Sequence, residues 1–130
     1  MKVVLFISSL FLLFSCYPTS TQGNLPANAK KNINQSINQW HKDAAKANFD
    51  AYFNRMVDSA VFIGTDAKEV WSKKEFMHFS KPYFDQKNSW NFKPLSRNVY
   101  IDSIKSIAWF DDLLVNWMGI CRGSGVVVLQ

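Results

Sequence analysis

The sequence has 130 residues, of which 48% are hydrophobic and 19% are charged, and this balance excludes a disordered chain. The formal net charge is +5, and the basic residues are scattered along the chain rather than gathered into one patch. Because a nucleic-acid-binding protein concentrates its positive charge, we expect one folded domain that binds no nucleic acid.

The first element in chain order is an N-terminal leader over residues 1–16. Lys2 precedes an apolar run of 12 residues, which is too short for a membrane-spanning helix of about 20 residues. The run ends at Cys16 in a pattern that resembles the lipobox of bacterial lipoproteins. We expect a signal peptide with lipidation at Cys16; the alternative is ordinary cleavage between Ser15 and Gly23. The protein is thus expected to be exported to the cell envelope, lipid-anchored and facing the periplasm or the exterior.

A polar tether is predicted over residues 17–29, and the folded domain over residues 30–130. The tether is rich in Pro, Thr, Ser and Asn and has no apolar periodicity. A flexible segment of this length spans about 20 Å. A lipid on Cys16 is the only membrane attachment that we expect. The tether would then hold the domain just off the membrane surface.

Three helices are predicted in the first half of the domain. An apolar stripe at helical spacing predicts the first helix from Ile33 to Ala47. Asn48 is a residue type that caps helices, so a second, shorter helix is expected to follow it. Ser72 and Glu75 match the S-x-x-E capping box at the start of a third helix. Pro82 is expected to end or bend that helix.

Strands are predicted between the second and third helices and throughout the second half. The run 60–63 is expected to form a short buried strand, and alternation from Trp90 onward predicts an antiparallel meander with strands near 99–101, 104–114 and 117–129. This order predicts an α+β fold, in which about three helices pack on the concave side of a cone-shaped, curved antiparallel sheet. Glycines inside the last strand suit strong curvature.

The residues of the whole domain resemble a known family. Short runs that begin at Trp40, Val61, Ala108 and Gly123 (WHKDAA, VFIGTD, AWFD and GSGV) are similar to the SnoaL-like branch of the nuclear-transport-factor-two-like superfamily, with its cystatin-like fold. The resemblance implies a cone open at one end, a hydrophobic pocket between the helices and the sheet, and homodimers formed through the sheet. It leaves the activity open, because this superfamily includes isomerases, cyclases, dehydratases and binding domains.

The end of the sequence departs from the family pattern. Relatives continue through one further strand after the position of the apolar run 126–129, so we expect that a final strand is missing. The alternative is that the free edge of the last strand pairs with a second copy in a homodimer.

His41 and Asp66 are the candidate catalytic residues. His41 lies beside the apolar stripe of the first helix, and Asp66 follows a glycine in a turn. Burial of such a group in an apolar pocket moves its pKa towards the working pH. The alternatives are a structural histidine and a turn aspartate that bonds its own backbone. The other ionisable candidates are Arg97, Asp102, Asp111 and Arg122.

Aromatic residues are the candidates for a ligand-binding lining. With 11 Phe, 5 Trp and 4 Tyr, a domain of this size has too little interior to hide every ring. We expect a pocket that is lined by Trp40, Tyr52, Trp71, Trp90, Arg97 and Trp109. The alternative is that these rings simply pack in the core.

Neither a metal nor a cofactor is expected. Two Cys and two His match no metal-ligand spacing, and the chain has no G-x-G-x-x-G or phosphate-binding loop. Three functions are expected, in this order: a domain that binds a small hydrophobic molecule, a cofactor-free isomerase, cyclase or dehydratase, and a structural or assembly domain without a ligand.

Overall fold

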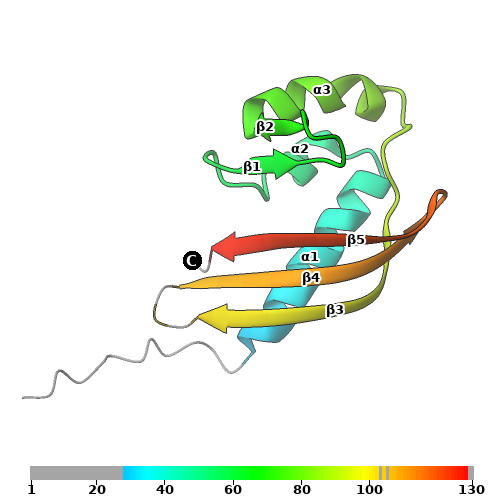
Figure 1. The fold of residues 1–130 in the computed structure, drawn as a ribbon. Coiled ribbons are helices and arrows are strands. Elements are labelled where there is room, and N and C mark those ends of the chain that lie inside the picture. Colours follow the sequence, from blue (N-terminus) through cyan, green and yellow to red (C-terminus); the bar gives the residue numbers. More distant parts are fainter. Residues whose placement is uncertain (1–27, 103, 105, 129–130) are drawn as a thin grey trace, which may run out of the picture.

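The computed structural model describes residues 28–102, 104 and 106–128 and places three helices and five strands in them. The predicted leader, Cys16 and nearly all of the predicted tether lie outside these residues and stay predictions. The elements are, in chain order (Figure 1), α1 (Ala29–Ala45), α2 (Phe49–Phe53), β1 (Val61–Ile63), β2 (Val70–Ser72), α3 (Lys73–Asp85), β3 (Lys93–Asp102), β4 (Ile107–Asn116) and β5 (Gly119–Val128).

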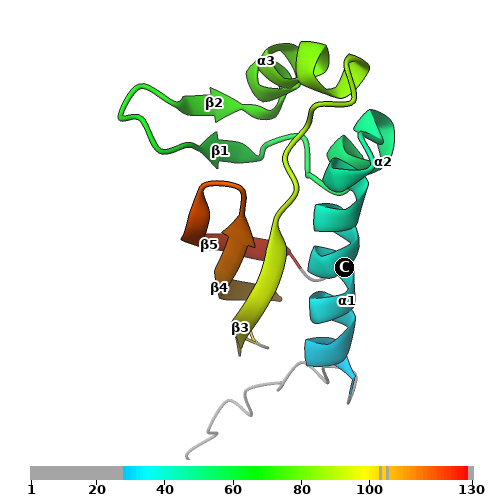
Figure 2. The ribbon, with the colours of Figure 1, turned by 90° about the vertical axis from the view of Figure 1, so that its right-hand side faces the viewer.

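The strands form two antiparallel sheets. β1 pairs with β2, and the second sheet has the order β3-β4-β5. Figure 2 shows α1 running along one face of the curved three-stranded sheet, with α3 above the β1–β2 hairpin. The predicted α+β fold, with three helices on curved antiparallel strands, is confirmed. No helix in the described residues combines the length and apolar character that a membrane span requires.

The capping signals are confirmed at two helix starts. The side chain of Asn48 accepts a hydrogen bond from the Ala51 N–H at the start of α2. Ser72 and Glu75 form a complete capping box at the start of α3, with each side chain bonded to the backbone N–H of the other residue. Both helix starts are therefore fixed by residues next to them in the sequence.

Several helix and strand boundaries differ from the prediction. Helix α1 begins four residues before Ile33, and β3, predicted near 99–101, is the longer strand Lys93–Asp102. Pro82 lies inside α3, which continues to Asp85, because the Gln86 N–H still reaches the Pro82 carbonyl group and Phe84 is buried in the core. Trp90 precedes the first long strand, which begins at Lys93. Strand β2 was not predicted, because its three residues are extended only through their pairing with β1.

Two hydrophobic clusters form the core. One cluster lies among the helices, with Ala44, Tyr52, Phe53, Phe76 and Phe84 at its centre, and the other lies between α1 and the sheet, with Ile33, Ile37, Val99 and Ala108 at its centre. His41 is one helical turn after Ile37 and one turn before Ala44. The buried face of α1 therefore places His41 between the two clusters.

A glycine on β5 makes room for an aromatic ring of the core. Gly125 lies opposite Phe110 on β4, and a Cβ atom at Gly125 would stand 2.8 Å from Cε1 of that ring. We expect Gly125→Ala to lower the free energy of unfolding by about 1–3 kcal/mol, because the ring must shift. Urea unfolding measures the change.

The matched control is Ser124→Ala, because Ser124 precedes Gly125 and its side chain is exposed. We expect this variant to change the free energy of unfolding by less than about 0.5 kcal/mol. Equal losses in the two variants would contradict the role given to the Phe110 ring.

Candidate functional site

A buried charged network joins α1 to the three-stranded sheet. His41 lies on α1, Arg97 on β3 and Asp112 on β4. Nε2 of His41 is 3.3 Å from Oδ2 of Asp112, and Nη2 of Arg97 donates to the same oxygen at 2.8 Å. Nε of Arg97 donates to Oδ1. The Asp112 side chain has no exposed surface, so its charge is balanced entirely by these protein groups.

The position of Arg97 is fixed on every side of its guanidinium group. Its Nη1 atom donates to Oδ1 of Asn38 at 2.8 Å and to the Asn34 carbonyl oxygen at 3.2 Å. Its central carbon lies 5.8 Å from the centre of the Phe110 ring. Together with the two bonds to Asp112, these contacts use all three guanidinium nitrogens and make a bidentate pair of defined geometry.

The strand register brings the two charges together. Arg97 and Asp112 are direct partners in the antiparallel β3–β4 ladder. Directly opposed residues have their side chains on the same face of the sheet, and here that face is the one that α1 covers. The predicted candidate Asp111 is one residue away and therefore projects from the opposite face.

The ionisation of Asp112 determines which ring nitrogen of His41 carries a proton. Burial by itself would raise the pKa of Asp112, but hydrogen bonds from His41 and Arg97, and the positive charge of Arg97, hold that pKa below its ordinary value of 3.8. The ionised carboxylate at neutral pH is a hydrogen-bond acceptor only. The proton in the bond between the two side chains is therefore on Nε2 of His41.

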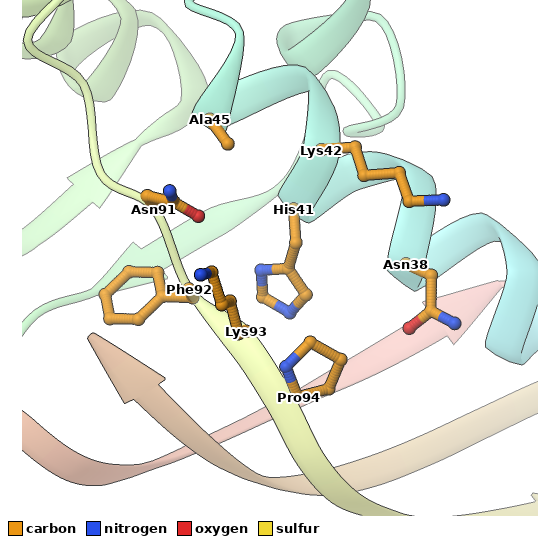
Figure 3. A pocket seen from close by; sticks show the side chains of 8 residues that line it. All are labelled: Asn38, His41, Lys42, Ala45, Asn91, Phe92, Lys93 and Pro94. Carbon is orange, nitrogen blue, oxygen red and sulfur yellow. The ribbon is translucent and has the colours of Figure 1, made fainter.

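The ring of His41 forms part of the wall of an open cavity of about 330 Å³ (Figure 3). Its lining comes from α1 and from the segment that leads into β3, and consists of Asn38, His41, Lys42, Ala45, Asn91, Phe92, Lys93 and Pro94. Within the described part of the chain, Nδ1 of His41 has no hydrogen-bond partner. The ring is thus held at one nitrogen, and the other is available to a ligand.

The structure separates the two predicted catalytic residues. His41 is buried in the network described above. Asp66 is exposed in the turn between β1 and β2, where its Oδ1 accepts a hydrogen bond from the Lys68 N–H at 2.8 Å. Asp66 is in the turn-bonding arrangement that was the alternative to catalysis.

The predicted aromatic lining is distributed over three places. Trp40, Tyr52, Trp71 and Trp90 pack in the helical hydrophobic cluster and do not line the cavity at His41. Trp71 also borders a separate open hollow beside the start of α3. Arg97 bonds Asp112 beneath that cavity. Trp109 lies on the opposite face of the sheet, 45% exposed, and stacks on Tyr100 with 5.6 Å between ring centres. Formation of a homodimer through this outer face stays a prediction.

Sequence analysis missed Asp112. The signal that identifies it is strand alternation, because Ala108, Phe110 and Leu114 share its face and are all apolar. A single acidic residue in such a series must meet a cation, and Arg97 fills that position across the strands. Among the described residues, no three His, Cys, Asp or Glu side chains are placed to hold a metal ion.

Comparison with known proteins gives the family and the fold. The model of the SnoaL-like domain family matches residues 33–130. An NTF2-like protein of unknown function from Pseudomonas putida has 12% sequence identity and a TM-score of 0.61 over 79% of this chain and 76% of its own. A structure from Catenulispora acidiphila has 13% identity and a TM-score of 0.57, covering 78% and 80%. No curated protein matches. The expected cone-shaped fold is confirmed by these neighbours.

The pKa of Asp112 gives a stability prediction. Because this pKa is lower in the folded than in the unfolded protein, the network contributes stability that is complete above about pH 4 and is lost as the pH falls through the folded value. We expect Asp112→Asn to lower the free energy of unfolding at neutral pH by about 3–5 kcal/mol, because Arg97 is left buried without its anion. The variant should also depend less on pH below about pH 4.

Chemical denaturation over a pH series measures both effects. Asp111→Asn is the matched control, since it removes the neighbouring, outward carboxylate and should change the free energy of unfolding by less than about 1 kcal/mol. If the free energy of unfolding of Asp112→Asn fell below pH 4 as steeply as that of the unaltered protein, the contribution assigned to Asp112 would be contradicted.

Proposed function

The chain belongs to the SnoaL-like domain family, and on that premise we propose that it binds a small, largely apolar molecule in the cavity beside His41. The observation that carries the proposal is the state of the histidine ring. Asp112 holds Nε2, while Nδ1 faces the cavity and has no partner among the residues that the structure describes. A ring that is fixed at one nitrogen and free at the other is suited to accept a hydrogen bond from a ligand.

The size and the lining of the cavity support the same proposal. A volume of about 330 Å³ is within the range of small-molecule sites, which begins at about 300 Å³. Phe92 supplies an aromatic ring at 6.3 Å from the His41 ring centre, and Ala45 and Pro94 add apolar surface. The other five lining residues are polar or charged, and they supply the groups that would fix the orientation of a ligand.

The same geometry favours a second function, a cofactor-free proton transfer of the isomerase, cyclase or dehydratase type. Neutral His41 would take a proton from the ligand at Nδ1. The positive charge that then forms on the ring would face the ionised Asp112, which already accepts the Nε2–H bond. Arg97 would act as a positioning residue, because it keeps Asp112 ionised and oriented.

The binding proposal predicts that ligand affinity depends on His41. We expect aromatic one-ring and two-ring fragments, detected by saturation-transfer NMR on the full chain, to bind His41→Gln about tenfold more weakly than the unaltered protein. His78→Gln is the control, since His78 is the other histidine and is exposed on α3. Fragments that bind all three proteins equally would place the site elsewhere.

The proton-transfer proposal predicts a measurable exchange reaction. With 2-tetralone as the probe in D₂O, we expect the protein to accelerate exchange of the protons next to the carbonyl group, and His41→Gln to lose about 100-fold of that acceleration. His78→Gln should retain it. Exchange at the buffer rate with the unaltered protein would argue against catalysis and leave the binding proposal in place.

A further inference from the structure

We infer that the ligand of this cavity carries a carboxylate, which Lys42 and Lys93 recognise at the cavity mouth. This inference deepens the proposed function and rests on it. The lining contains two lysines and two asparagines, and no aspartate or glutamate among its described residues. A cavity whose charged groups all have one sign attracts a ligand of the opposite sign.

The two lysines are available because neither has a carboxylate partner within the described residues. Two other lysines of the domain have carboxylate partners: Lys73 bonds Asp58 at 2.9 Å, and Lys81 bonds Asp85. Lys42 and Lys93 differ from the remaining lysines in lining the cavity. Lys42 and Lys93 have no such ion pair and are exposed. Figure 3 shows Lys93 beside the His41 ring and the Lys42 side chain extending from α1 away from the ring. Lys42 has a flexible four-carbon stem, so it reaches an anion at the mouth by turning its side chain towards Lys93.

The acidic residues around the cavity are compensated by other cations. Asp112 receives two bonds from Arg97 in addition to the one from His41. Asp43 follows Lys42 on α1, but its carboxylate accepts from Arg55 at 2.9 Å and from Gln39 at 2.8 Å. Lys42 and Lys93 therefore set the sign of the potential at the cavity mouth.

The amide groups of the lining make the cavity rich in hydrogen-bond donors. Oδ1 of Asn38 accepts the bond from Arg97, which leaves the Asn38 amide N–H groups for a ligand. With the two ammonium groups, the lining offers several donors, and neutral His41 adds one acceptor at Nδ1. A carboxylate accepts hydrogen bonds only, so it matches these donors. A donor group elsewhere on the ligand would bond Nδ1 of His41, and the apolar part of the ligand would contact Phe92.

Three probes of similar shape test the inference: 6-hydroxy-2-naphthoate, 6-hydroxy-2-naphthamide and (6-hydroxy-2-naphthyl)methylammonium, each with a hydroxyl group that can donate to Nδ1 of His41. Calorimetry with the full chain at low salt should give about tenfold tighter binding of the naphthoate than of the amide, and the weakest binding for the ammonium. In the double variant Lys42→Gln/Lys93→Gln the preference for naphthoate over naphthamide should disappear. The control is Lys30→Gln/Lys31→Gln, which removes the same charge from the exposed start of α1 and should keep the preference.

The possible outcomes separate this inference from the proposed function. Equal binding of all three probes, lost in His41→Gln, would overturn the inference and leave the proposed function standing. If Lys30→Gln/Lys31→Gln reduced the preference for the naphthoate as much as Lys42→Gln/Lys93→Gln, the preference would reflect a general attraction to a positively charged protein. That result would also overturn the inference. Failure of all three probes to bind, or binding that His41→Gln leaves unchanged, would overturn both.

Discussion

The buried carboxylate of Asp112 is the group on which the arrangement of helix and sheet depends. Arg97 reaches it from the neighbouring strand and His41 from the helix, so three elements meet at two oxygen atoms. A fully buried charge is strongly unfavourable when it loses a partner, and each member of this network needs the others. The network therefore fixes how α1 lies on the sheet, and with it the position of the His41 ring.

Stability and function use the same contacts in this domain. The hydrophobic clusters on either side of His41 exclude water from the network, which strengthens its hydrogen bonds. Asp112 stays ionised despite this burial because His41 and Arg97 bond its carboxylate. The ring is therefore oriented before any ligand arrives, and a ligand need not spend binding energy on ordering it. On the open side, the two lysines and two asparagines line the cavity that the His41 ring faces. The site is thus rigid at its base and adaptable at its mouth.

Local signals were enough to predict the helices, whereas the site required the strand register. The capping box at Ser72 and Glu75 acts over three residues and was visible in the sequence. Asp111 and Asp112 are adjacent acidic residues, and only the pairing of β3 with β4 decides which of them meets Arg97. The same strand register places Trp109 on the sheet face that points away from α1. Strand β2 exists because β1 pairs with it, so no local pattern revealed it.

The most direct test of this account is the protonation of the His41 ring, measured by long-range ¹⁵N–¹H correlation NMR at alkaline pH. His78→Gln leaves His41 as the single histidine of the chain and so assigns its signals. The account predicts a neutral ring with the proton on Nε2 and a bare Nδ1. A proton on Nδ1 with a bare Nε2 would contradict the bond to Asp112 and the site built on it.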